Sequence, residues 1–283
     1  MFSHVSKENY PKQYRELYTE GQWFSSVHDL FERNTIANTI IYREKIAAKL
    51  PEHFGKEFYS KQFTLLDIGG GNGKRSEFIL QSLLEQPNQI RIDYNDISKY
   101  QYRKYQSVLS ENLNEVFLGD FDTIDINKTY HFILCIHTLY GCIDWNSDDA
   151  DKNSLVKIRR LLAPKGLACI IIRDKNNISH FIQNRFKDYI GIIDSTICAE
   201  EIFQVLQKFN IPYDFDEAHS ITPQEELFGN NGLSDLSKNF ISFFMHKKFD
   251  AILPEYIEIV TAEIKKRAHK FEIDSSKIIW IYS

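Results

Sequence analysis

The sequence lacks the patterns that mark metal-binding, disulfide-bonded and nucleic-acid-binding proteins. It has four cysteines in 283 residues, without a C-x-x-C pair or a cysteine and histidine spacing typical of a metal site. We therefore predict no metal centre, and we expect the cysteines to be small buried hydrophobic residues. No run of five like charges occurs and the formal net charge is −5, which disfavours nucleic acid as a partner.

Long apolar segments are also missing. No stretch of about 18 residues, the minimum for a membrane-spanning helix, is apolar throughout. The first residues are too polar for a signal peptide. We therefore expect a cytoplasmic protein, monomeric or homodimeric, without a membrane partner. Its 43% hydrophobic content is enough for a substantial core.

A glycine-rich turn is the most informative stretch that is present. An apolar run over residues 63–68 contains an acid, Asp67, and a helical pattern follows the turn. The pattern predicts a strand, a tight turn and a helix. Glycines let the backbone approach a ligand closely, and the first turn of the helix offers free N–H groups. The glycines are Gly69, Gly70, Gly71 and Gly73.

The spacing of this turn excludes two common nucleotide-binding loops. Lys74 stands where a dinucleotide-binding loop needs its third glycine, and Arg75 stands where a Walker A loop needs Ser or Thr. What remains is D-x-G-x-G-x-G, which resembles motif I of class I S-adenosylmethionine (SAM) methyltransferases. An ordinary glycine-rich turn is the alternative. The resemblance implies SAM as the cofactor, with its amino-acid end held around Asp67, Gly69, Gly71 and Gly73.

Strand and helix signals alternate after this turn. Apolar runs such as YHFILCI predict strands buried on both faces, and the alternation predicts a doubly wound α/β sheet with its ligand crevice at the carboxyl ends of the strands. The methyltransferase resemblance implies a Rossmann-like sheet of seven mostly parallel strands. Further strands are predicted at 90–95, 115–118, 130–136, 167–173, 211–219 and 277–282, and helices at 152–162, 179–188, 199–208, 235–246 and 253–268.

We divide the chain into three segments of one fold. Residues 1–55 are aromatic and helical, with a helix expected to end at Pro51, and they form either a lid over the substrate or a helix packed on the domain edge. Residues 56–176 form the SAM-binding core. Residues 177–283 add substrate-side helices and closing strands, with a polar surface loop or flap at 223–235.

Acidic residues at strand ends are the candidates for holding the cofactor. A ribose diol is best held by a carboxylate, which accepts both hydroxyl hydrogens. Asp96 at the exit of the second strand is preferred over Asp93 inside it, although Asp96 or Ser98 could also cap the next helix. After the third strand, Asp120 could accept the adenine amine and Phe121 could stack on the ring. A plain turn is the alternative there.

A closer resemblance covers nearly the whole chain. The layout is similar to histamine N-methyltransferase and its relatives, as carried by Leu50-Pro51, the IGGG-x-G turn, Asp96 to Gln101, and Ile136 to Tyr140. It implies that Gln101 and Ile136 lie at the cofactor. The three substrate-binding residues of that family are absent from the matching stretches, which contain Asn34–Asn38, His137 and Ser275–Lys277. Histamine itself is therefore in doubt.

These observations predict a SAM-dependent methyltransferase that acts on a small molecule, at an amine or heterocyclic nitrogen. An O-methyltransferase, or a SAM-binding protein that transfers no methyl group, such as a pericyclase or a pseudoenzyme, is the alternative. The catalytic candidates are His137 and Tyr140, with His137 as a base or as a residue that positions substrate. Residues 137–140 do not resemble the Asn/Asp-Pro-Pro-aromatic motif of nucleic-acid amino methylation.

Overall fold

The computed structural model describes most of the chain after residue 35. The described residues are 36–59, 62–84, 90–142, 144–191, 197–220, 227–229, 232–268 and 274–283. The first 35 residues of the predicted lid lie outside this set, so the choice between lid and edge packing stays a prediction. No helix among the described residues is both long and apolar enough to cross a membrane.

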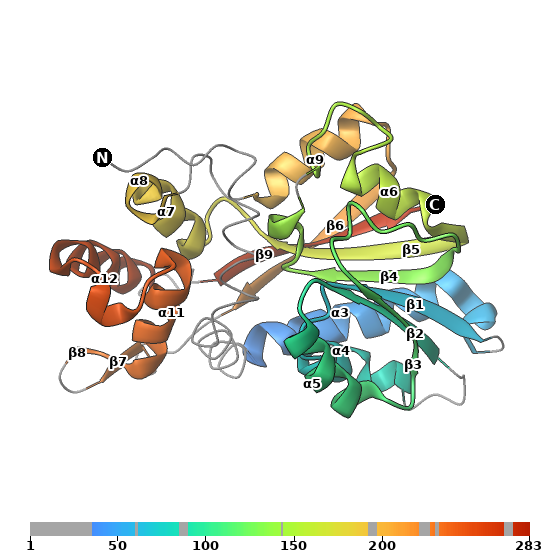
Figure 1. The fold of residues 1–283 in the computed structure, drawn as a ribbon, viewed down its shortest axis with the longest axis horizontal. Helices are drawn as coiled ribbons and strands as arrows, with labels where there is room; N and C mark the ends of the chain where they lie inside the picture. The colour runs from blue at the N-terminus through green and yellow to red at the C-terminus, as the bar shows by residue number, and fades with distance from the viewer. Residues whose placement is uncertain are drawn as a thin grey trace. The chain divides into compact units, whose positions relative to one another are not determined.

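A seven-stranded sheet with the order β3-β2-β1-β4-β5-β9-β6 confirms the predicted α/β fold (Figure 1). Within this sheet the neighbouring strands from β3 to β5 pair in parallel, with Asp67 opposite Tyr94 and Ile68 opposite Cys135. The strands are β1 (Phe63–Ile68), β2 (Ile90–Asp96), β3 (Leu113–Leu118), β4 (Tyr130–Ile136), β5 (Leu162–Arg173), β6 (Tyr213–Ser220) and β9 (Asp274–Tyr282).

The order of side-chain pairs indicates that β9 runs antiparallel to β6. Lys277, Trp280 and Tyr282 follow one another along β9, and they bond to Glu217, Asp216 and Asp214, which follow one another in the reverse direction along β6. Such pairing is expected only when the two strands have opposite directions. This strand makes the sheet mostly, rather than wholly, parallel.

The chain separates into two compact units. The first, called the core unit, comprises Thr39–Ile172, Glu200–Glu217 and Lys277–Ser283, and the second, called the helical unit, includes Arg173–Ala199 and Ala218–Ser276. The helices of the core unit are α3 (Ile36–Phe54, which begins just before it), α4 (Lys74–Leu84), α5 (Lys99–Leu109), α6 (Ser154–Arg160) and α9 (Ala199–Lys208), with 3₁₀ turns η1 (Gly55–Tyr59) and η2 (Leu139–Gly141).

Helix α3 extends beyond the predicted end. It passes through Pro51 and ends at Phe54, because a proline this close to the end of a helix removes only one of the last backbone bonds. Its buried residues Tyr42, Ile46 and Leu50 recur every four residues and are at most 1% exposed. This apolar stripe anchors the helix within the core unit.

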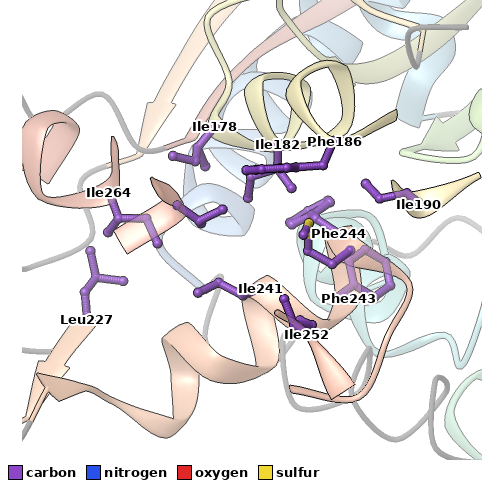
Figure 2. Close-up of a cluster of buried hydrophobic side chains, with 12 residues drawn as sticks. Ile178, Ile182, Phe186, Ile190, Leu227, Ile241, Phe243, Phe244, Ile252 and Ile264 are labelled. Atoms are coloured by element: carbon purple, nitrogen blue, oxygen red, sulfur yellow. The ribbon is translucent and has the colours of Figure 1, made fainter. Parts of the chain in front are cut away.

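The helical unit has a hydrophobic core of its own, and Figure 2 shows Ile178 and Ile182 of α7 pointing toward the side chains of α11. Isoleucines make up half of this cluster, and Phe186, Phe243 and Phe244 are its aromatic residues. Its elements are α7 (Ile178–Arg185), α8 (Lys187–Ile190), α11 (Asp235–Met245), η3 (Phe249–Ala251), α12 (Pro254–Ala268) and the hairpin of β7 (Phe228–Gly229) with β8 (Gly232–Leu233).

Buried polar groups fix the beginning of β9 in the helical unit. The Ser275 hydroxyl donates to the buried carboxylate of Asp174 and lies 3.1 Å from Nδ1 of His219. Asn177 donates its side-chain amide to the Ser275 carbonyl at 3.0 Å. These bonds satisfy polar groups that would otherwise destabilise the interior.

Several predicted boundaries were wrong. The strand predicted to begin at residue 167 begins at Leu162, and Pro164-Lys165-Gly166 lies inside it as an irregularity of its pairing with β4, with Lys165 at the left-handed φ of 64°. The helix predicted over 179–188 is divided at Phe186 into α7 and α8, and the loop predicted at 223–235 contains the β7–β8 hairpin. The four cysteines are free and buried, as predicted.

The first testable prediction concerns a buried tyrosine of β4. Tyr130 donates its hydroxyl to Asp93 at 2.8 Å in the interior. Tyr130→Phe should lower the free energy of unfolding by about 1–3 kcal/mol, because it leaves a buried carboxylate with one donor fewer. Tyr282→Phe is the matched control, since Tyr282 donates to the exposed Asp214. Urea denaturation measures both, and equal losses would contradict the argument.

Candidate functional site

The glycine turn between β1 and α4 is the centre of the candidate site. Gly69 and Gly71 have φ values of 63° and 55°, a region that favours glycine. A Cβ on Gly69 would lie 2.1 Å from the Thr138 side chain, whereas a Cβ on Gly71 would meet no atom within 4 Å. Gly69 is therefore required by packing inside the protein, and Gly71 presents its backbone to open space.

Asp96 joins this turn to the start of α5. Its carboxylate accepts hydrogen bonds from the N–H of Gly71 at 3.0 Å and from the N–H of Ser98 at 2.8 Å. Ser98, not Asp96, is the N-cap, because its hydroxyl accepts from the N–H of Gln101. Burial raises the pKa of Asp96 to about 6, although these N–H donors act in the opposite direction.

Asp67 lies beneath the turn and is 1% exposed. Burial raises its pKa to about 6, opposed by hydroxyl donors from Ser76 and Tyr105, and the charge of Asp96 raises it further. The Tyr105 hydroxyl lies 2.9 Å from the carboxylate, and Tyr94 donates its hydroxyl to the Gly71 carbonyl at 3.0 Å. Two acids and two tyrosines therefore support the turn from the protein side.

The two tyrosines are site residues that the sequence reasoning missed. Their rings lie 4.2 Å apart between centroids. The available signal was the spacing of α5, in which Gln101, Tyr105 and Leu109 recur every four residues and are all buried. That stripe places Tyr105 on the face of α5 that is turned toward the protein interior.

Gln101 carries an unsatisfied acceptor. The residue is 1% exposed, and its side-chain carbonyl oxygen has no hydrogen-bond partner in the described part of the protein. Leaving such an oxygen without a donor costs about 1–3 kcal/mol. A ligand with a hydrogen-bond donor would remove this cost.

The carboxylate of Asp93, the alternative to Asp96 as the ribose acceptor, is already bonded to other side chains of the protein. It lies inside β2 and accepts from Tyr130 at 2.8 Å and from Asn114 at 2.8 Å, and the Lys128 ammonium lies 2.5 Å away. Asp96 is the acid of this strand that the fold brings to the glycine turn.

The segment after β3 adjoins Asp96. The N–H of Gly119 donates to the Asp96 carbonyl at 3.0 Å, which places Asp120 and Phe121 directly beyond this contact. Phe121 is 4% exposed. Asp120 is half-buried and accepts the N–H of Asp122 at 3.2 Å.

Thr138 ties the end of β4 to the turn, beside the predicted cofactor neighbour Ile136. Its hydroxyl is 3.0 Å from the Ile136 carbonyl and 3.4 Å from the Gly69 carbonyl. His137, which lies between Ile136 and Thr138 in the chain, adopts the left-handed φ of 52°, which is rare for a residue with a side chain. Such strain is typical of functional positions.

His137 lies among aromatic rings. Its Nδ1 is 3.3 Å from the Tyr140 hydroxyl, and the two rings are within 7° of parallel. The ring of Tyr42 from α3 lies edge-on, 6.2 Å away between centroids. The structure therefore brings the two predicted catalytic residues together and adds Tyr42, which the sequence reasoning did not include.

Two side chains around the turn favour a ligand that donates hydrogen bonds. They are the Asp96 carboxylate, which is bonded to the turn, and the amide oxygen of Gln101 on α5, and both are acceptors. No group of three or more potential metal ligands occurs in the described part of the chain. The predicted cofactor residues at the ends of β1, β2 and β4 and after β3 are thus neighbours along one connected set of contacts.

Similarity to known proteins comes from structure alone. Neither a protein-family model nor a curated protein sequence matches the chain. The plantazolicin methyltransferase BamL, solved with S-adenosylhomocysteine (SAH), is 16% identical over 98% of this chain and 96% of that chain, with a TM-score of 0.57. Loganic acid methyltransferase, also solved with SAH, is 14% identical over 88% of this chain and 95% of that chain, with a TM-score of 0.57. The fold is that of methyltransferases. At these identities the likeness extends to the architecture and not to the choice of substrate.

The second testable prediction follows from the raised pKa of Asp67. Well below its usual pKa of 3.8 the acid is protonated in both folded and unfolded chains, and between 3.8 and about 6 the folded chain keeps the proton that the unfolded chain loses. The stability that this proton provides therefore declines over this range and is lost once the pH has risen through 6. Asp67→Asn has no such loss, so its unfolding free energy relative to the parent should increase by about 2–3 kcal/mol from pH 4 to pH 7.

Asp216→Asn is a control whose stability relative to the parent should change with pH in the opposite direction. Burial would raise the pKa of Asp216, but its bonds to Lys45 and Trp280 lower it overall, so the parent loses this contribution as the pH falls. Urea titrations followed by tryptophan fluorescence measure both variants. A pH-independent difference between Asp67→Asn and the parent would show that Asp67 titrates normally.

Proposed function

We propose that the protein is a SAM-dependent methyltransferase that acts on a small molecule, at an amine or heterocyclic nitrogen. The observation that carries the proposal is the glycine turn bonded to the Asp96 carboxylate, together with the buried oxygen of Gln101 on α5, which lacks a donor among the described residues. The methyltransferase fold supports it. When bound, SAM supplies an electrophilic methyl group on a sulfonium centre.

The residues present fit this cofactor. Gly71 leaves room where a side chain would otherwise project, and the turn offers acceptors to the hydroxyl and ammonium donors of SAM. The Asp96 carboxylate accepts the N–H of Gly71 on one oxygen and the N–H of Ser98 on the other, and it would also accept the ribose hydroxyls. Asp120 and Phe121 would hold the adenine, and Ile136 would pack against the cofactor.

His137 and Tyr140 would hold the methyl acceptor. Displacement at a sulfonium needs the nucleophile close and aligned, so positioning supplies most of the acceleration. A neutral amine needs no base in the transfer itself, and the Tyr140 hydroxyl would keep the imidazole in one orientation. Tyr42 adds an aromatic wall behind His137. An oxygen acceptor would instead need His137 as a base.

A methyl-transfer screen tests the proposed function. Radiolabelled SAM would be incubated with the full chain and with pooled amines, phenols and natural-product extracts. Methyl transfer to an amine would support the proposal. Transfer to a phenol would show that the protein is an O-methyltransferase instead. Binding of SAM without any acceptor would favour a protein that uses the cofactor without methylation.

The third testable prediction concerns the ribose acceptor. Asp96→Ala should weaken SAH binding by about 2–4 kcal/mol, or roughly 30- to 1000-fold in Kd, because it removes a charged acceptor of two hydroxyls. Asp93→Asn is the matched control, since that acid lies on the same strand and is held by Tyr130. Calorimetric titration measures both, and an Asp96→Ala affinity within threefold of the parent would exclude this role.

The fourth testable prediction concerns His137. With the acceptor found in the screen, His137→Gln should raise KM for the acceptor, change kcat by less than about tenfold and leave SAH affinity unchanged, because the side chain only orients an amine. A fall in kcat of roughly 10²- to 10⁴-fold would instead show a catalytic base. A variant identical to the parent would remove His137 from the site.

A further inference from the structure

Lys157 of α6 binds the segment that follows β3. Its ammonium donates to the carbonyl oxygens of Phe121 and Ile124, both at 2.5 Å, and lies 3.5 Å from the carbonyl of Asp122. It also lies 4.8 Å from the centroid of the Phe121 ring, within the range of a cation–π contact. One side chain therefore holds both the backbone and the ring of Phe121.

This lysine differs from the other lysines near it. Burial lowers the pKa of Lys157 even though the carboxylates of Asp122, Asp120 and Asp125 favour its charge. Lys128 and Lys152 have carboxylate partners instead. The Lys157 ammonium loses part of its hydration there, and its bonds to the carbonyls and the nearby carboxylates offset this cost.

A second residue of α6 holds the same segment. The Ser154 hydroxyl donates to the Asp122 carboxylate at 2.6 Å, and the N–H of Asp144 donates to the other oxygen of that carboxylate at 3.3 Å. Helix α6 itself begins at a well-formed N-cap, Asn153, which accepts from the N–H groups of Leu155 and Val156. The segment is therefore fixed to a rigid element at two points.

We propose that Lys157 is a positioning residue for the purine base of the cofactor, acting through Phe121 and Asp120. The inference rests on the proposed function, in which these two residues hold the adenine. Lys157 fixes the direction of the chain at Phe121, and the Gly119 bond to Asp96 fixes it two residues earlier. Asp120 lies between these two points, and its carboxylate accepts the N–H of Asp122, so its backbone and its side chain are both held.

The fifth testable prediction compares the affinities of two ligands, measured by calorimetry. One is SAH, and the other is S-inosylhomocysteine, its analogue in which an oxo group replaces the adenine amine. The parent should prefer SAH. Lys157→Met keeps the length of the side chain and removes its donors, so SAH affinity should fall at least tenfold and the preference for the amine should shrink. Lys157→Arg keeps a charged donor, so it should retain part of the SAH affinity and part of the preference for the amine.

Three further comparisons separate positioning from plain stability. Lys152→Met is the matched control, because Lys152 is exposed and pairs with Asp149. Its affinities should equal those of the parent. In a Phe121→Leu background, Lys157→Met should cost little additional SAH affinity, since both act on the same contact. Ser154→Ala removes the other bond between α6 and this segment, so it should also reduce the preference for SAH over S-inosylhomocysteine. This variant provides the test if Lys157→Met does not fold.

The outcomes distinguish this inference from the proposed function. A parent chain that binds neither product would overturn the proposed function and the inference together. A parent that binds SAH, with a Lys157→Met variant that is less heat-stable but has the parent's affinity and preference, would overturn the inference alone. Full additivity with Phe121→Leu would do the same, because Lys157 would then act independently of that ring.

Discussion

Two carboxylates at one turn, the buried Asp67 and the half-buried Asp96, constrain the residues around them. Each is less stable as an anion than in water, so the fold must supply donors close by. The hydroxyls of Ser76 and Tyr105 serve Asp67, and the N–H groups of Gly71 and Ser98 serve Asp96. A Cβ on the adjoining Gly70 would lie 2.6 Å from Asp67, so the turn can approach the acid only as bare backbone. The conformation that satisfies the acids also opens the turn to a ligand.

The core unit brings the candidate site residues together from separate elements. Asp67, Asp96 and Asp120 lie at or just after the ends of β1, β2 and β3. His137 and Tyr140 follow β4, directly after the predicted cofactor neighbour Ile136, and the His137 ring contacts Tyr42 of α3. BamL and loganic acid methyltransferase share this architecture at 16% and 14% identity, so the likeness is one of fold and not of particular site residues.

Lys157 illustrates how a loop at the end of a strand acquires a fixed shape. The segment after β3 has few regular backbone bonds, and its carbonyls would repel one another if they were turned to one point without a cation. Helix α6 provides that cation and also the Ser154 hydroxyl. The position of the adenine-binding candidates is then determined by a helix more than thirty residues later in the chain.

The sequence alone determined the fold class and most of the cofactor candidates, because buried parallel strands are continuous apolar runs and glycine turns have characteristic spacing. Strand ends also converge in any parallel sheet, so Asp96 and His137 could be placed at one edge. Local patterns could place Tyr105 on the buried face of its helix, but they could not reveal the partners of Tyr42, Tyr105 or Lys157, since these lie at least 33 positions away. The strained φ of His137 and the continuation of β5 through Pro164 were likewise decided by tertiary contacts. Long-range packing and hydrogen bonding override weak local preferences there.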